Sequence, residues 1–209
     1  QHNHVAIGTH ELDTVDSFCY LGDNLCAGGG CELATITRTR SAWKKFRELL
    51  PLLSARCLSW CTRGRTYNSY VRSAMLYGCE FWPNKKEDLR RLERNERTML
   101  RWMCHIKPGG NTSTEDLRQK LGLSDLSREI RYRHLRWFGH VYRSSSVTKS
   151  ILDFQVAGRR KRGRPRMTWR ELIDGDLRDW GLSPRDALDR VFWKRTLANR
   201  MQRLTQSCV

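Results

Sequence analysis

Long apolar runs, secretion signals and catalytic motifs are missing from this sequence. No apolar stretch approaches the roughly 18 residues that a membrane-spanning helix needs, which excludes a transmembrane protein. The start, residues 1–4, has neither an initiator methionine nor the apolar segment of a signal peptide. We therefore expect a piece of a longer intracellular chain, present in the nucleus and cytoplasm, with no membrane partner.

Motifs for enzymatic chemistry are absent as well. The chain has no glycine-rich phosphate loop between a strand and a helix, no nucleophile elbow and no zincin helix. Two carboxylate pairs, Asp174 with Asp176 and Asp186 with Asp189, lie among arginines on predicted helix surfaces. Solvated ion pairs explain such carboxylates better than acid–base catalysis does. We expect no catalytic residues, so this chain by itself is not an enzyme.

The eight cysteines include no CxxC pair, and no secretion signal accompanies them. We therefore expect reduced thiols rather than a disulfide framework. Three pairs have a spacing loosely typical of zinc ligands: Cys26 with Cys31, Cys57 with Cys61, and His134 with His140. Because these pairs do not form one compact knuckle, we predict no metal site and no cofactor in this chain.

Positive charge dominates the residues that are present. The chain has 39 Lys+Arg against 22 Asp+Glu, a net charge of +17, and arginine outnumbers lysine 30 to 9. Residues 110–209 contain 22 basic and 11 acidic side chains, whereas residues 1–109 contain 17 and 11. The planar guanidinium binds phosphate bidentately, so a polyanion is the expected partner and nucleic acid is the commonest one. The plain alternative is a helical protein whose surface is merely basic.

The sequence predicts a mainly α fold with a short β region at its start. Hydrophobic residues make up 39% of the chain, which excludes wholesale disorder. Residues 4–7 and 15–21 are rich in β-branched and aromatic side chains and predict the two strands of one hairpin. The glycines of residues 27–30 predict a flexible joint, so residues 1–30 form the first unit.

Helical spacing predicts two helical domains after this joint. The first covers residues 31–107, with helices expected at 31–49, 62–82 and 85–106; Pro51 is expected to lie just past the first of them. The face of residues 85–106 that alternates acidic and basic residues is typical of a solvated surface. Proline and glycine at residues 108–111 predict a boundary, and a basic helical domain follows over 112–209.

The helix predicted at residues 125–143 carries two stripes. One is expected to face the core: Leu126, Ile130, His134, Trp137 and Val141. On that stripe, His134 is expected to be a packed core histidine rather than a ligand. The other stripe is cationic, and we expect it to bind nucleic acid: Arg133, Arg136, His140 and Arg143.

Further along, short helices are bounded by local signals. Residues 113–121 precede Gly122, Thr168 and Glu171 form a capping box, and one last helix is expected from Ser183 to about residue 204. Tryptophans next to arginines, at positions 102, 137 and 169, would suit stacking on bases, but their helical phase favours the core for most of them.

Residues 158–166 form a run of arginine, lysine, glycine and proline without any apolar side chain. The basic residues are candidate phosphate ligands: Arg159, Arg160, Lys161, Arg162, Arg164 and Arg166. Phosphate contacts of this kind make binding steeply salt-dependent. The segment Arg162-Gly163-Arg164-Pro165 also has the core of an AT-hook, which lays arginines along the minor groove of A·T-rich DNA. A nuclear-localisation run or a loop crossing a nucleic-acid backbone are alternatives.

Six sequence blocks follow one another in a specific order: residues 15–22 (VDSFCYLG), 42–46 (AWKKF), 77–82 (YGCEFW), 97–103 (RTMLRWM), 135–141 (LRWFGHV) and 162–169 (RGRPRMTW). This set resembles the C-terminal part of reverse transcriptases from non-LTR, LINE-type retrotransposons, and is most similar to the RTE-like endonuclease–reverse transcriptases. The resemblance runs from about residue 12 to at least residue 195. The blocks depart from the family pattern at residues 78–82, where Gly-Ser-Glu-Thr-Trp is expected, and the Cys/His knuckle of many LINE C-termini is missing.

The resemblance implies a parent protein that copies RNA into a nicked chromosomal site. Residues 1–30 would end the palm, with primer-grip-like residues Phe18, Tyr20, Leu21 and Gly22. Residues 31–107 would be the helical thumb, and residues 112–209 would contact template RNA, primer or target DNA. The polymerase aspartates and the endonuclease lie outside this chain, so the divalent metal of the parent polymerase, expected to be Mg²⁺, would be bound by the upstream palm, a further partner.

Three other functions stay open at this point. A domesticated chromatin module would use Arg162–Arg166 as a DNA hook and would prefer A·T-rich duplex over RNA. A translated relic would have no selected partner. Association of the basic helices with anionic membrane surfaces is the most distant alternative.

Overall fold

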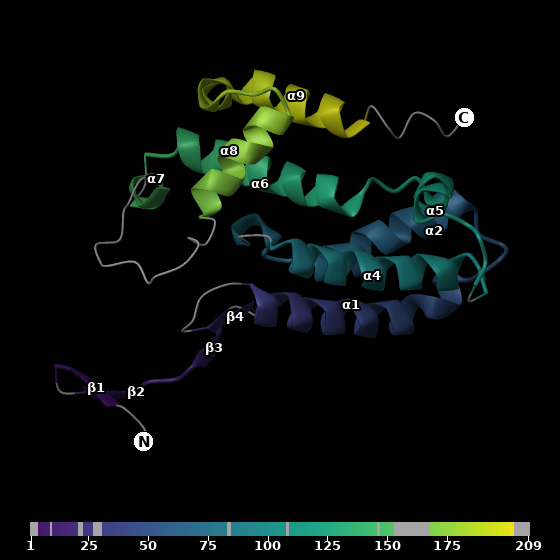
Figure 1. Ribbon diagram of the computed structural model, residues 1–209, viewed down its shortest axis with the longest axis horizontal. Coiled ribbons are helices and arrows are strands. Elements are labelled where there is room, and N and C mark those ends of the chain that lie inside the picture. The colour runs from purple at the N-terminus through teal and green to yellow at the C-terminus, as the bar shows by residue number, and fades with distance from the viewer. Residues whose placement is uncertain are drawn as a thin grey trace.

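The computed structural model describes residues 4–8, 10–20, 23–26, 31–82, 85–107, 109–145, 147–152 and 168–202. These residues form a mainly α structure, which confirms the expected fold class (Figure 1). The strands are β1 (His4–Ile7), β2 (His10–Asp13), β3 (Ser17–Tyr20) and β4 (Asp23–Cys26). The longer helices are α1 (Glu32–Leu53), α2 (Trp60–Thr66), α4 (Lys86–Met103), α5 (Thr114–Leu121), α6 (Leu126–Arg143), α8 (Trp169–Asp179) and α9 (Arg190–Gln202). Shorter segments are a π-helix η1 (Tyr67–Arg72), α3 (Ser73–Met75), the 3-10 helices η2 (Cys79–Phe81) and η3 (Pro184–Leu188), and α7 (Val147–Leu152).

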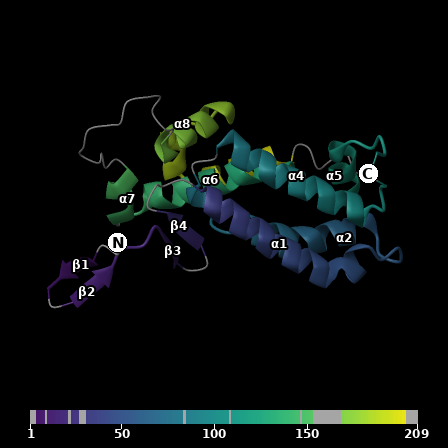
Figure 2. The ribbon, with the colours of Figure 1, turned by 60° about the horizontal axis from the view of Figure 1, so that its bottom comes forward.

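The strands form two hairpins rather than the single hairpin that the sequence predicted. β1 pairs antiparallel with β2, and β3 pairs antiparallel with β4, with Phe18 opposite Leu25. Gly8 adopts a left-handed φ of +64°, which lets the chain turn back at once and use residues 10–13 as the partner of β1. The predicted pairing of residues 4–7 with 15–21 is therefore wrong. Figures 1 and 2 show the β1–β2 hairpin lying away from the helices.

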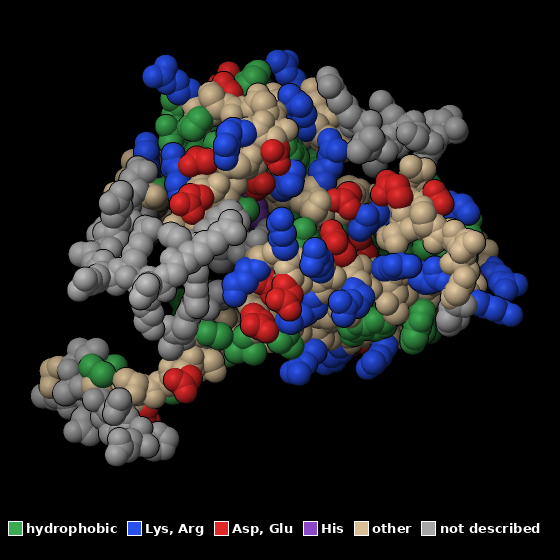
Figure 3. All heavy atoms as spheres, viewed as in Figure 1, with side chains coloured by type: hydrophobic (Ala, Val, Ile, Leu, Met, Phe, Trp, Pro, Cys, Tyr) green, Lys and Arg blue, Asp and Glu red, His purple; other side chains and the backbone are tan. Residues whose placement is uncertain are grey.

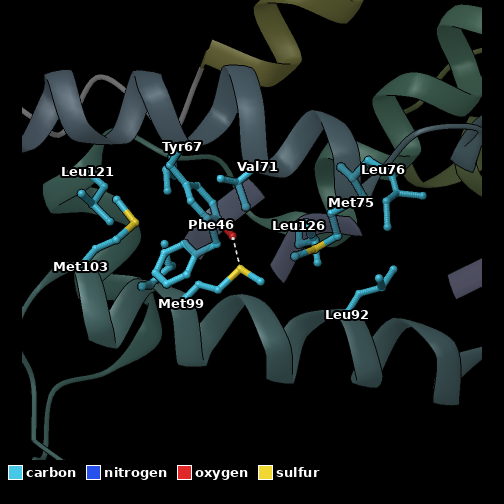
Figure 4. Packing of buried hydrophobic residues seen from close by; sticks show 14 of the residues in the cluster. Phe46, Tyr67, Val71, Met75, Leu76, Leu92, Met99, Met103, Leu121 and Leu126 are labelled. Carbon is cyan, nitrogen blue, oxygen red and sulfur yellow. Dashed lines mark hydrogen bonds between the residues drawn. The ribbon is translucent and has the colours of Figure 1, made fainter. Parts of the chain in front are cut away.

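A first hydrophobic core joins α1, the helical run from α2 to α3, α4, α5 and the start of α6. Figure 4 shows Tyr67 and Val71 pointing from this run toward Met99 of α4. α1 continues through Pro51 to Leu53, so the prediction that Pro51 lies beyond this helix is wrong. The buried Leu53 side chain packs in this core, and its burial favours the extra helical turn.

The π-helix lies in the middle of a continuous helical run from residue 60 to residue 75. Its first residue, Tyr67, is buried and donates its hydroxyl to the sulfur of Met99 at 3.7 Å, and burial raises its pKa. Its last residue, Arg72, is fully buried. Before the π-helix, Gly64 of α2 lies directly against α5. A Cβ added at Gly64 would be only 1.8 Å from the Leu121 carbonyl oxygen. α2 and α5 therefore meet backbone to backbone.

A second core joins the C-terminal half of α6 with α8, η3 and α9. Leu135 and Phe138 of α6 belong to it, whereas Leu126 and Ile130, earlier on the same helix, belong to the first core. The first core also includes Leu117 of α5, so it extends past the boundary predicted at residues 108–111. That domain boundary stays a prediction.

The single helix expected from Ser183 to about residue 204 is divided into two segments, η3 and α9. Ser183 and Asp186 form a capping box, as the sequence indicated, but the segment that they open is the 3-10 helix η3. Asp189 is extended, and its carboxylate accepts the backbone N–H groups of Val191 and Phe192 at 2.9 Å, which begins α9. The predictions for α5, α6 and the Thr168–Glu171 capping box are confirmed.

A buried carboxylate connects the elements of the first core. Glu96 of α4 is fully buried and accepts hydrogen bonds from Arg72 at 2.7 and 2.9 Å and from Arg118 at 2.9 and 3.2 Å. Arg72 also donates to the Ser124 carbonyl at 2.7 Å, and Arg118 to Asp125 at 2.6 Å. Burial lowers the pKa of Arg118, but the carboxylates of Glu96, Asp125 and Glu115 together more than offset this, so the pKa is raised and the guanidinium stays charged.

The expectation that the charged face of this helix is solvated is therefore wrong at Glu96. Asp88, near the start of α4, is buried as well, and it accepts hydrogen bonds from Cys31 and Thr35 at 3.3 Å. Glu96 lies four residues after Leu92 and three before Met99, so it shares their face of the helix. Because acidic and basic residues alternate along this helix, the sequence pattern assigns Glu96 to the solvated face rather than to the buried one.

We expect Glu96→Gln to lower the free energy of unfolding by about 3–5 kcal/mol, because it removes the counter-charge of the fully buried Arg72 and one of the carboxylates that pair with Arg118. Urea denaturation followed by circular dichroism measures this loss. The matched control is Glu48→Gln on α1, which removes an exposed carboxylate 2.8 Å from Lys45. This control should leave the transition essentially unchanged. Equal shifts for the two variants would contradict a structural role of the buried charge.

Candidate nucleic-acid interface

Lys and Arg side chains are spread over the visible face of the molecule, with Asp and Glu among them (Figure 3). Positive charge alone therefore does not locate a binding site. A site needs cations that are free of neighbouring carboxylates, together with a shape that holds a ligand.

An open groove of about 1280 Å³ lies between α6 and α9, next to η2, and some of its cations are free of neighbouring carboxylates. Its cationic lining consists of Arg133, Arg136, His140 and Arg143 from α6, with Arg190 and Lys194 from α9. Glu80 and Glu129 are the carboxylates in the lining. All four residues of the predicted cationic stripe thus line one groove. The two cations of α9 were missed, although their i,i+4 spacing places them on one helix face.

Two members of the stripe are held by the protein itself. Arg133 donates to Glu129 at 3.0 Å and to the Leu76 carbonyl at 3.3 Å. Arg143 donates to the carbonyl of Ala187 in η3, and burial, together with the nearby Arg190, lowers its pKa. These two side chains therefore position α6 against its neighbours as well as lining the groove.

Three cations remain available to a ligand. Arg136, Arg190 and Lys194 are exposed, and within the described part of the chain no ion pair or hydrogen bond engages their side chains. Because they lie on both sides of the groove, they surround its opening with positive charge. Such an arrangement suits a nucleic-acid backbone, which carries one phosphate per nucleotide.

Aromatic rings lie between these cations. Phe81 of η2 is 58% exposed, and its ring centroid is 5.0 Å from that of Trp137 of α6 in an edge-to-face arrangement. Trp137 in turn lies 5.6 Å from the exposed ring of His140. Trp137 was expected in the core but is only half-buried and lines the groove. The Trp137 side chain lies at the edge of the α6 face that packs in the core, next to the solvent-facing side of the helix.

The other two tryptophans next to arginines also lie outside the core proper. Trp102 is 50% exposed and packs edge-on against Trp43 of α1 at 5.8 Å. Trp169 of α8 is half-buried and donates its indole N–H to the Glu80 carbonyl at 2.8 Å. The expectation that most of these rings are core is wrong, because their helix faces lie at the margins of the two cores.

His134 behaves as the sequence predicted. It is fully buried, with Nδ1 3.0 Å from the Asp176 carboxylate of α8 and Nε2 2.9 Å from the Cys79 carbonyl of η2. Each ring nitrogen therefore lies within hydrogen-bond distance of an oxygen on another element. His134 thereby fastens α6 to α8 and to the segment that carries Phe81.

Of the other predicted site residues, the structure describes only some. Phe18 and Tyr20 are exposed on β3, where the neighbouring strand β4 contacts α1 through a 2.8 Å hydrogen bond from Asn24 to Thr37. Leu21 and Gly22 lie outside the described residues. So do all six basic residues of the arginine-rich run: Arg159, Arg160, Lys161, Arg162, Arg164 and Arg166.

The described cysteines are free thiols. Across the described ranges, no three His, Cys, Asp or Glu side chains come together as a metal site would require. In the pair of histidines whose spacing is loosely typical of zinc ligands, His134 is buried and His140 is exposed. Nor does any helix in the described ranges have the length and apolar character needed to cross a membrane.

Comparison of the chain with family models, with curated proteins and with solved structures finds no match.

Gly139 sets the approach of α6 to α9, because a Cβ there would lie 2.2 Å from Nε1 of Trp193. We expect Gly139→Ala to destabilise the second core by about 1–3 kcal/mol through overpacking. On α8, nothing lies within 4 Å of a Cβ added at Gly175. Gly175→Ala should therefore stabilise the chain by about 0.5–1 kcal/mol. Thermal and urea melts compare the two variants, and a Gly139→Ala protein as stable as Gly175→Ala would contradict the close approach.

Thiol reactivity should follow burial. Burial and the Asp88 carboxylate raise the pKa of Cys31 to about 12, and burial also raises the pKa values of Cys79 and Cys104. These three thiols stay protonated at a pH of about 8, so iodoacetamide should label them only after unfolding. Rapid labelling is expected at the exposed cysteines: Cys19, Cys57 and Cys61. Mass spectrometry of native and denatured samples reads out each site, and native labelling of Cys31 at the rate of Cys57 would contradict the prediction.

Proposed function

We propose that this chain binds nucleic acid through the groove between α6 and α9, as the thumb and C-terminal part of a LINE-type reverse transcriptase. The observation that carries the proposal is the combination, in one open groove, of three available cations with the exposed ring of Phe81 and the half-buried ring of Trp137. Phosphates and bases are the two chemical groups that these side chains would bind together.

The size of the groove favours a polymer over a small molecule. Its volume of about 1280 Å³ exceeds the roughly 300–1,000 Å³ that is usual for small-molecule pockets. It is also open to solvent and lined on both sides by cations. A chain of nucleotides running along it would place successive phosphates near Arg136 on one side and Lys194 on the other.

The sequence blocks behind the resemblance also support the proposal, because they meet in space. Phe81, in the block at residues 77–82, contacts Trp137 in the block at 135–141. In the block at 162–169, Trp169 donates to the carbonyl of Glu80. Described residues from three blocks that are far apart in the sequence thus contact one another beside the groove.

In the proposed role the chain holds template RNA, primer or target DNA during target-primed reverse transcription. No catalytic step is assigned to its residues. The metal-dependent polymerase chemistry would belong to the upstream palm, of which residues 1–30 would form the end. The proposed work of this part is positional: it keeps a polyanion aligned while the palm extends the primer.

The double variant Arg136→Ala/Lys194→Ala should weaken binding and flatten its salt dependence. Each phosphate contact contributes about 0.7 to the slope of log K against log salt for single strands, so the slope should fall by roughly 1.4. Fluorescence anisotropy across a salt series measures it with an RNA hairpin, a primer–template hybrid and an A·T-rich duplex. The control is Arg97→Ala, an exposed cation of α4 outside the groove lining.

A folded wild-type chain that binds none of the three probes at low salt would contradict the proposal. So would an equal fall in slope for the Arg97 control and the groove variant. A preference for the A·T-rich duplex that Arg164→Ala abolishes would instead favour the chromatin module.

A further inference from the structure

We infer that the groove binds an unpaired stretch of nucleic acid and that Phe81 and Trp137 form the platform on which a base stacks. This inference rests on the proposed function and adds the class of ligand: single-stranded RNA or DNA rather than duplex. It assigns base contact to two side chains and leaves phosphate contact to Arg136, Arg190 and Lys194.

The first argument is the exposure of Phe81 in a rigid setting. η2 begins after Gly78, whose φ of +76° turns the chain sharply, and the Phe81 N–H donates back to the Gly78 carbonyl at 3.2 Å. The carbonyl of Cys79 accepts from His134, and that of Glu80 accepts from Trp169. Two separate helices therefore fix the backbone that presents this ring.

A ring that is both exposed and fixed loses little conformational freedom when a ligand stacks on it. Single exposed apolar side chains are common on protein surfaces and need no explanation. Here, however, Phe81 contacts Trp137, which in turn lies against His140, and all three rings line a groove that cations also line. An apolar protein partner would leave Arg136, Arg190 and Lys194 without counter-charges, whereas a nucleic acid supplies them.

The second argument separates single strands from duplexes. In a duplex the faces of the bases are covered by their neighbours, so rings on a protein reach them only where bases are unstacked. Single-stranded sites typically combine a basic groove with aromatic side chains, and this groove has both features. Because every base has a π-face, such stacking tolerates any sequence. The groove should therefore favour unpaired over paired nucleic acid, with little preference among bases.

The experiment compares three probes of about eight nucleotides: a single strand, the same backbone with abasic sites, and a duplex. Phe81→Ala should weaken binding of the single strand about 5- to 150-fold, the range expected for losing one stacked base. The abasic probe should bind wild type and variant equally, because it offers phosphates without bases. Phe81→Trp should restore binding, since it restores a stacking face.

Tyr70→Ala is the matched control. Tyr70 is 59% exposed on the π-helix and does not line the groove, so its loss should change no affinity. A circular dichroism melt confirms that each variant is folded, and Phe81 is exposed enough for its truncation to leave the melt near that of wild type. Trp137→Phe, which keeps a ring at the half-buried position, should retain most of the affinity.

The outcomes separate the two proposals. If Phe81→Ala weakens binding of the abasic probe as much as that of the base-containing strand, or if the duplex binds as tightly as the single strand, base stacking is excluded while phosphate binding in the groove stands. If Arg136→Ala/Lys194→Ala has no effect on any probe, the groove itself is excluded as the binding site, and the proposed function fails with it.

Discussion

The carboxylate of Glu96 is the charge on which the first core depends. It accepts four hydrogen bonds from Arg72 and Arg118, so the π-helix, α4 and α5 share one buried anion. Burying charges is costly unless each is paired and hydrogen-bonded, and this cluster meets both conditions. Through Ser124 and Asp125 the same two arginines also fix the point at which α6 begins.

α6 transmits this arrangement to the rest of the molecule. Its first half completes the first core and its second half begins the second, so one rigid helix orients both. At its middle, His134 connects to η2 and α8 through its two ring nitrogens. Further on, Gly139 allows Trp193 to approach, and that approach sets the distance between α6 and α9. The groove is the solvent-facing side of this junction.

Under the proposed function, structural and binding roles divide among similar side chains of the groove. Arg133 and Arg143 lie on the same stripe as Arg136, yet carbonyl and carboxylate oxygens of the protein hold the first two. We expect these anchored arginines to influence binding mainly by keeping α6 in place. The unengaged cations would carry the salt dependence, and the fixed ring of Phe81 would supply the discrimination between paired and unpaired ligands.

Local patterns in the sequence were enough to predict the mainly α class, the bounds of α5 and α6, the capping box of α8, the burial of His134 and the cationic stripe, because helix caps and faces are set by residues three or four positions apart. The burial of Glu96 could also have been predicted, since Glu96 lies on the same helix face as Leu92 and Met99. The pairing of β1 with β2, the continuation of α1 through Pro51 and the position of Phe81, Arg190 and Lys194 in one groove emerged only from the three-dimensional structure. The hairpin follows from the turn at Gly8, whereas packing of the two cores extends α1 and brings the three groove residues together.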